Sequence, residues 1–427
     1  MRRRAAYDAA MLAAAFAVVA SVVASVVAPA AVVRGAVAVR PAPQVPAPPA
    51  QTPQPAPPPA AFDFAAAAAD VAATFRRECA AAGVVGAGLA IVRGGEVAAF
   101  AGHGLADRAG GRAVDLDTNF HWASCTKTFT AIAVMQLRDR GKLGLDQPIV
   151  ELVPELRDVH NPFGPNTAIT VRHLLQHAGG FRAATWPWGG DLDWHPHEPT
   201  QWSQLVAMLP YTSVEFAPGS KFAYSNPGIV FLGRAIERVT GEEYEVHMEK
   251  NVLRPLGMAR AYFDRSPWHL QRFRSHSYEG AGAAATDLGP DFDTGITVSN
   301  GGLNASLADM AKYLSFLLGA APAASDAGGV LAPASLAAMW QPALPTNATG
   351  TEHIGLGFFV QEHGGTRFPT HTGSQRAFVS FFYVHPASGT GACAAFNTSV
   401  AGPAMARVRA LCMQRLSLPL VASATGR

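Results

Sequence analysis

The sequence predicts an α+β fold, in which an antiparallel sheet is flanked by N- and C-terminal helices and carries an inserted, mainly helical subdomain. Three observations indicate this arrangement. A helix and a hairpin pattern open the folded part, a long stretch of helical patterns follows, and strand-like runs return only near the end. Because strand patterns lie at both ends of the chain, we expect one sheet assembled from both ends.

The elements expected before residue 145 each end at glycine or at a glycine pair, as helix ends and hairpin turns often do. They are a helix over 62–82, two apolar runs over 84–92 and 96–101 around Arg93-Gly94-Gly95, and a helix over 126–140 that stops at Gly141.

The second half of the folded part begins with helical patterns and closes with strands and a helix. Helical spacing interrupted by Pro and Gly fills 146–274, including 174–177, 229–240 and 244–253. Strand-like runs follow over 355–361, 377–385 and 391–397, and a last helix is expected over 401–416.

The N-terminal region predicts export. Residues 2–4 are arginines, and residues 9–33 carry no charge. We interpret 1–33 as a signal peptide or a membrane anchor, because an apolar stretch of this length could also span a bilayer. Residues 34–60 form a Pro-rich linker, since dense proline keeps a chain extended. We expect the domain over 61–418 to lie outside the cytoplasm, in the periplasm, in the medium or tethered to a membrane.

Composition excludes two classes of protein. The 33 Lys and Arg residues nearly balance 31 Asp and Glu, and a net charge of +2 lacks the basic surface of a nucleic-acid-binding protein. An apolar content of 49% excludes an intrinsically disordered chain. The basic residues are 28 arginines and five lysines, so each lysine is noteworthy.

The cysteines and one aromatic segment leave alternatives open. The four cysteines show no metal-binding spacing, although Cys79 and Cys412 could pair in an oxidising compartment. The segment from Trp186 to Glu198 is rich in Trp, His and acidic residues. We interpret it as a loop that lines a cleft, with Trp186 shaping an apolar pocket, rather than as a metal site.

A Ser-x-x-Lys motif at the start of the helix over 126–140 carries the first sign of chemistry. Ser124 and Lys127 lie one helical turn apart, so the amine can reach the hydroxyl. A serine hydroxyl is a poor nucleophile and needs a base, which a lysine of lowered pKa can provide. An arginine at this position would remain protonated.

Two further short motifs follow in order along the chain. Tyr224-Ser225-Asn226 precedes a helical pattern, and His371-Thr372-Gly373 lies where we expect a strand-like run to start. Each triplet is short enough to occur by chance, so the ordered set of three motifs is the informative observation.

The chain around these motifs resembles the penicillin-recognising serine hydrolases, in particular class C β-lactamases, D-Ala-D-Ala carboxypeptidases and related esterases. The resemblance extends over most of 75–410. The segments that carry it are 120–131 around Ser124, the Leu-Leu-x-His segment that ends in His177-Ala-Gly-Gly, 218–226 ending in Asn226, and Gly301-Gly302-Leu303 before a helix with Asp309 and Tyr313.

The resemblance implies a role for each motif residue. Ser124 would be the acylated nucleophile, and Lys127 and Tyr224 would share the proton transfers, with either one as the base. Asn226 would orient the substrate. The backbone N–H groups of Ser124 and Ser374 would form an oxyanion hole.

The third motif departs from the β-lactamase pattern, because His371 stands where those enzymes carry Lys. Its ring could donate a hydrogen bond or, if charged, attract a substrate carboxylate. Thr372 and Gly373 would line the substrate with it. Arg376 stands where relatives often carry Gly, and it is either a carboxylate clamp or a surface residue.

We therefore expect an exported serine hydrolase that cleaves a carboxylic ester or amide, carboxypeptidase-like or esterase-like, with a small-molecule or peptide substrate. A β-lactamase is the alternative within this class, and a non-catalytic binding or regulatory protein on the same fold is the alternative outside it. We expect no metal or other cofactor. The chain has no Gly-x-Ser-x-Gly or His-Glu-x-x-His motif, and no helix opens with Gly-x-Gly-x-x-Gly.

Overall fold

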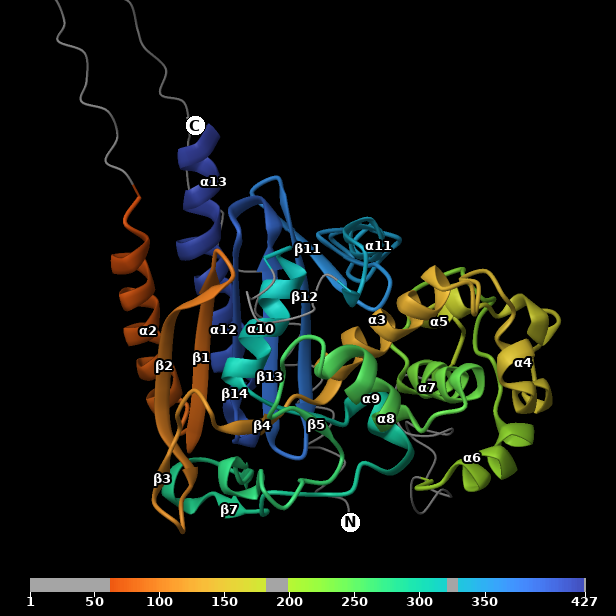
Figure 1. Ribbon diagram of the computed structural model, residues 1–427, viewed down its shortest axis with the longest axis horizontal. Helices are drawn as coiled ribbons and strands as arrows, with labels where there is room; N and C mark the ends of the chain where they lie inside the picture. Colours follow the sequence, from red (N-terminus) through yellow and green to blue (C-terminus); the bar gives the residue numbers. More distant parts are fainter. Residues whose placement is uncertain (1–61, 182–198, 321–328, 426–427) are drawn as a thin grey trace, which may run out of the picture. The chain divides into compact units, whose positions relative to one another are not determined.

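The computed structural model describes residues 62–181, 199–320 and 329–425. Within these ranges the main sheet is antiparallel throughout, with strand order β3-β2-β1-β14-β13-β12-β11-β10-β9 (Figure 1). Strands from the two ends of the chain, β1 and β14, are neighbours, as predicted. The strands are β1 (Gly86–Arg93), β2 (Glu96–Asp107), β3 (Arg112–Ala113), β9 (Leu344–Pro345), β10 (Glu352–Ile354), β11 (Phe359–His363), β12 (Thr366–Gln375), β13 (Phe378–His385) and β14 (Thr390–Phe396).

The two faces of the sheet pack against different helices. On β13, Phe381 and Tyr383 join a core cluster with α2 (Phe64–Ala81) and α12 (Gly402–Cys412), which is followed by α13 (Leu418–Thr425). Phe382 lies in a second cluster, with α3 (Thr126–Asp139) and α10 (Leu307–Leu317). This alternation is what a strand buried on both faces requires. The N- and C-terminal helices thus cover one face, which confirms the predicted fold (Figure 1).

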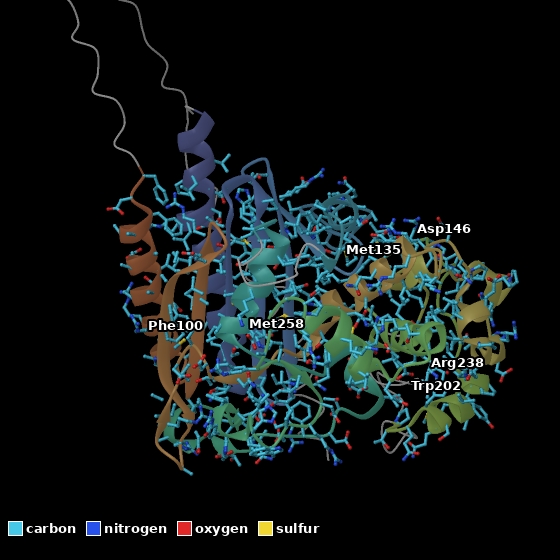
Figure 2. The ribbon with its side chains drawn as sticks, in the orientation of Figure 1. Phe100, Met135, Asp146, Trp202, Arg238 and Met258 are labelled. Carbon is cyan, nitrogen blue, oxygen red and sulfur yellow. The ribbon has the colours of Figure 1, made fainter. Side chains whose placement is uncertain are left out.

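The segment between the two parts of the sheet is mainly helical, as predicted. Met135 of α3 and Met258 are buried there, whereas Asp146 and Arg238 lie on its surface (Figure 2). Its helices are α4 (Ile149–Leu152), α5 (Val171–Leu175), α6 (Trp202–Met208), α7 (Asn226–Thr240), α8 (Tyr244–Met248) and α9 (Val298–Gly301), and α11 (Pro333–Met339) follows later.

Two small sheets accompany the main one, and the sequence did not predict them. The first has the order β4-β8-β5, and the second pairs β6 with β7. The small sheet with β4 matters for the site, because β4 leads directly into the turn that carries Ser124 and then into α3. The strands are β4 (Asn119–His121), β5 (Tyr262–Phe263), β6 (Tyr278–Glu279), β7 (Thr286–Asp287) and β8 (Leu303–Ser306).

One predicted strand position is wrong. We expected His371-Thr372-Gly373 to begin the strand-like run over 377–385, but the triplet lies inside the separate strand β12. Arg376 and Ala377, with φ of 43° and 65°, form the tight turn from β12 to β13. Two successive positive φ values match the twist of a hairpin. The sequence does not predict this turn, because positive φ values are usual for Gly or Asn and neither residue is one of these.

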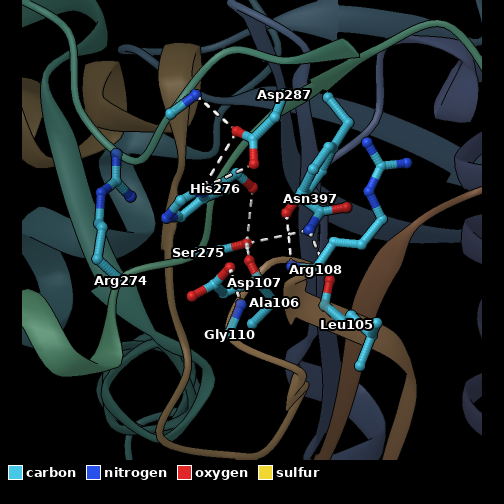
Figure 3. A network of polar contacts seen from close by, with 12 residues as sticks. Leu105, Ala106, Asp107, Arg108, Gly110, Arg274, Ser275, His276, Asp287 and Asn397 are labelled. Atoms are coloured by element: carbon cyan, nitrogen blue, oxygen red, sulfur yellow. Dashed lines mark hydrogen bonds and ion pairs between the residues drawn. The ribbon is translucent and has the colours of Figure 1, made fainter. Parts of the chain in front are cut away.

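A polar network fastens the segment after β5 to the ends of strands β2 and β14 (Figure 3). The Asn397 amide donates to the Leu105 carbonyl at 3.0 Å and to the Ser275 hydroxyl at 3.1 Å. Nearby, His276 bonds Asp287 at 2.9 Å. The two Asn397 bonds join residues more than a hundred positions apart, so they hold the long connection in place without extending the sheet.

The predictions for the N-terminus lie outside the described residues. These include the apolar stretch 9–33 and the linker 34–60. In the ranges that the structure describes, no helix has both the length and the apolar character to cross a membrane. All four cysteines are buried free thiols, so the disulfide considered between Cys79 and Cys412 is not present. Both of these cysteines lie in the core cluster of α2 and α12.

The cluster under α2 makes a prediction about stability. Phe75 is fully buried, and its ring lies 5.9 Å from that of Phe396. Phe75→Ala should lower the free energy of unfolding by about 3–5 kcal/mol in chemical denaturation, because it leaves a cavity. Arg77→Ala, at an exposed position of the same helix, is the control and should change it by less than about 0.5 kcal/mol. Equal effects of the two variants would contradict this packing.

Candidate active site

Ser124 lies in a 3-10 turn, Ala123–Cys125, that leads into α3. Ala123 has a φ of 47°, a left-handed conformation that is unusual for a residue with a side chain. The turn is held from both sides, because the Trp122 N–H donates to the Leu303 carbonyl at 2.8 Å and the Thr126 hydroxyl to the Ala123 carbonyl at 2.6 Å. Ser124 therefore sits at the N-terminal end of a helix, which favours negative charge on its oxygen.

Lys127 is fully buried beside this serine. Its amine donates to Ser124 Oγ at 3.0 Å and to the Asn300 carbonyl of α9 at 2.8 Å. Burial lowers the pKa of Lys127 from 10.5 to about 7. No ion pair with a carboxylate is found for it among the described residues. Near neutral pH a large share of the molecules therefore carry a neutral amine that can accept a proton.

Tyr224 lies just before α7 and reaches the same serine. Its hydroxyl hydrogen-bonds to the Ser124 side chain, and burial raises its pKa above the ordinary value of 10.0. The Lys127 amine lies 4.9 Å from the centre of the tyrosine ring. The phenol therefore stays protonated at neutral pH, and it can donate a proton at Ser124.

Strand β12 runs against the turn of Ser124. A Cβ added at Gly373 would lie 2.3 Å from the Trp122 carbonyl oxygen and 3.1 Å from Ala123 Cβ, so this approach admits only glycine. The close contact brings Ser374, the next residue of β12, beside the turn that carries Ser124. Thr372, on the other side of Gly373, is half-buried.

His371 is buried in β12 and is neutral. Its Nδ1 donates to the Thr372 carbonyl at 2.6 Å, because a carbonyl oxygen can only accept. Burial, reinforced by the charge of Lys127, lowers the pKa of His371 to about 3. A neutral His371 carries no charge with which to attract a carboxylate. Its Nε2 is buried, has no hydrogen-bond partner in the structure and can accept.

Asn226 is the first residue of α7, capped by the Ser225 side chain. Its backbone carbonyl accepts a long hydrogen bond of 3.5 Å from the Asn300 amide, the residue whose carbonyl also binds Lys127. The Asn226 Oδ1 atom is buried without a partner. His371 Nε2 is likewise a buried acceptor without a partner, although buried polar atoms are normally paired.

Two candidates are not part of this group. Arg376 is exposed at the β12–β13 turn, where its guanidinium lies 5.5 Å from the centre of the Phe292 ring. It takes no part in the hydrogen bonds around Ser124. Trp186 lies in 182–198, outside the described residues. Cys125 is buried against β12, and burial raises the pKa of its thiol to about 12, so it is not a second nucleophile.

Three residues of the site were not assigned a role from the sequence. Asn300 holds the lysine, and Phe359 packs on both His371, at 5.2 Å between ring centres, and Tyr224, at 6.4 Å. His177 stacks on Tyr224. Asn300 directly precedes Gly301-Gly302-Leu303, and His177 is the histidine of the Leu-Leu-x-His segment. The resemblance therefore pointed to both places, and only the function of the two residues was missed. In the described part of the chain, no cluster of His, Cys, Asp and Glu could hold a metal.

Known sequences similar to this chain identify its family. The profile of the Beta-lactamase family matches residues 36–411. Esterase EstB from Burkholderia gladioli is 34% identical over 209 residues, which cover 47% of this chain and 53% of the esterase. The chain spans about half the length of the curated relatives it matches.

Solved structures agree with the fold. The octameric penicillin-binding protein homologue from Pyrococcus abyssi has a TM-score of 0.69 and 26% identity, over 82% of this chain and 77% of that one. A class C β-lactamase has a TM-score of 0.70 and 19% identity, over 84% and 99%, and shows the fold alone. The sequence resemblance to this group is therefore confirmed.

The buried amine predicts a pH dependence of stability. The unfolded chain keeps Lys127 protonated up to about pH 10.5, whereas the folded chain releases the proton near pH 7. Between these values the unfolded state binds more protons, so the free energy of unfolding should rise with pH. Lys127→Met should lose this rise, as measured by chemical denaturation at several pH values. The same slope in both proteins would contradict a neutral Lys127.

Proposed function

Because the chain belongs to the Beta-lactamase family, we propose that it is a serine hydrolase that cleaves a carboxylic ester or amide through an acyl-enzyme on Ser124. One observation carries the proposal above all others, the buried Lys127 amine at 3.0 Å from Ser124 Oγ without a counter-ion in the described residues. A structural lysine would be exposed or paired with a carboxylate.

In the first step Lys127 acts as the base. Its neutral amine takes the proton of Ser124 while Oγ forms a bond to the substrate carbonyl carbon. The carbonyl oxygen takes up the electron pair of the broken π bond. The N–H groups of Ser124 and Ser374 would stabilise this oxyanion, since the Gly373 contact brings the two residues together.

Tyr224 would serve the second half of the reaction. As the intermediate collapses, the bond to the leaving oxygen or nitrogen breaks, and that atom takes a proton from Tyr224. The Lys127 ammonium returns a proton to the phenol. Water then attacks the acyl carbon and gives up one proton to Tyr224 and Lys127. These residues pass a proton to Ser124 Oγ as its bond to the acyl carbon breaks, so the acid is released and Ser124 is restored.

The neutral acceptors bear on the substrate. Asn226 Oδ1 and His371 Nε2 are both buried and unpaired, and both can accept a hydrogen bond. Two acceptors suit a substrate that carries N–H or O–H groups near its carbonyl. They also suit a substrate that has no charged group beside the carbonyl. A cation that would bind a carboxylate is absent at His371. The similarity to an esterase supports the ester as the first class to test.

The setting of the enzyme is also a proposal. Three arginines followed by the uncharged stretch 9–33 support export or a membrane anchor, with the catalytic domain outside the cytoplasm. Measurement of the mature N-terminus and of membrane retention distinguishes a cleaved signal from an anchor.

Covalent labelling tests the nucleophile. A fluorophosphonate should add to one serine, Ser124, as read by mass spectrometry, and Ser124→Ala should not be labelled. The labelling rate of the wild type should rise with pH through about 7, as Lys127 loses its proton. Lys127→Ala should slow labelling by about 10²-fold or more. An unlabelled wild type would instead support a non-catalytic binding protein.

Parallel assays separate the substrate classes. A short-chain p-nitrophenyl ester should be hydrolysed with a kcat/KM about 10²-fold or more above that of a chromogenic cephalosporin, because neutral His371 offers no charge to the cephalosporin carboxylate. A D-Ala-D-Ala peptide completes the panel, and Ser124→Ala is the control in each assay. Rapid cephalosporin turnover would contradict the role given to His371 and indicate a β-lactamase.

A further inference from the structure

His177 occupies a strained and fully enclosed position. It follows the end of α5 with a φ of 52°, and it is only 1% exposed. The left-handed conformation is unfavourable for a residue with a Cβ unless the surroundings enforce it. Here the His177 N–H donates to the Leu174 carbonyl at 3.2 Å, so the chain turns sharply toward the segment that carries Tyr224.

His177 accepts two hydrogen bonds, one from the residue before Tyr224 and one from the residue after it. The Ala223 N–H donates to the His177 carbonyl at 2.9 Å, and the Ser225 N–H donates to His177 Nδ1 at 3.1 Å. The residues before and after Tyr224 are therefore both held by one histidine. The backbone of Tyr224 cannot rotate without breaking one of these bonds.

The imidazole ring also contacts the phenol. The ring centres of His177 and Tyr224 are 4.6 Å apart at an interplanar angle of 32°. Phe222 packs edge-on against His177 at 5.9 Å. The side chain of Tyr224 thus rests on a ring that is itself fixed by its Nδ1 bond.

This arrangement requires a neutral histidine. Nδ1 accepts the Ser225 N–H, so it carries no proton. Burial holds the pKa of His177 well below its usual value, and the neighbouring Lys127 and His371 act in the same direction. A proton on Nδ1 would point at the Ser225 N–H and break the contact.

We propose that His177 is a positioning residue, which uses its carbonyl, its Nδ1 atom and its ring to hold the Tyr224 hydroxyl at Ser124. The inference rests on the proposed hydrolase function. It assigns a catalytic consequence to a residue that touches neither Ser124 nor the substrate in our mechanism. A purely structural histidine would affect folding alone.

The decisive experiment is a double-mutant cycle with Tyr224→Phe. The measured quantity is kcat for ester hydrolysis, and the concentration of active enzyme is obtained by titrating Ser124 with the covalent label. His177→Phe keeps a ring but loses the acceptor, so kcat should fall by about 10²-fold with KM within about threefold. In the Tyr224→Phe background the same substitution should change kcat by less than about twofold, because no hydroxyl remains to be positioned.

A second variant covers the case in which His177→Phe does not fold. Asn tolerates the left-handed backbone and can offer an acceptor, so His177→Asn should lower kcat by only about three- to fivefold, again with no further loss in Tyr224→Phe. His173→Asn, at a half-buried histidine of α5, the helix that precedes His177, is the control and should leave kcat unchanged.

The outcomes are distinct. An equal fold-loss in both backgrounds, or no loss of kcat in a folded His177 variant, would overturn the proposal while leaving Ser124 catalysis intact. Failure of the wild type to label at Ser124 would overturn the proposed function instead.

Discussion

The site depends on one buried amine that has no counter-ion in the described residues. Among the described residues, the hydrogen bonds of the Lys127 amine go to the Ser124 hydroxyl and the Asn300 carbonyl. A protonated amine is costly there, which brings the neutral form within reach at physiological pH. The same amine makes further positive charge unfavourable nearby, and it helps to keep both His177 and His371 neutral. The result is a centre made of neutral groups, which the proposed mechanism requires for its proton transfers.

Three segments from distant parts of the chain meet at this centre. The 3-10 turn brings Ser124, the start of α7 brings Tyr224, and β12 brings His371. The close approach at Gly373 and the carbonyl of Asn300 connect them. The sheet and the helical subdomain therefore each supply residues of the candidate site.

Much of this could be predicted from local patterns. Apolar spacing and terminal glycines located α2 and α3, because both signals act within a few residues. The Ser-x-x-Lys spacing gave the contact of Ser124 and Lys127 for the same reason. The turn at Arg376 and Ala377 could not be predicted, since their positive φ values are imposed by strand pairing. Nor could the neutrality of His371 or the part played by Asn300, because both depend on burial and on residues far away in the chain.

The pairing of β1 with β14 also constrains how the molecule comes into being. Ala87 lies opposite Phe396, so a bond ladder at the centre of the sheet joins residues about three hundred positions apart. A polypeptide that emerges with its N-terminus first cannot close this sheet until nearly all of it has been synthesised. Loop closure over such distances is slow, and β1 and β2 must wait with open edges. The open strand edges are therefore exposed to pairing with other chains until β14 has been synthesised.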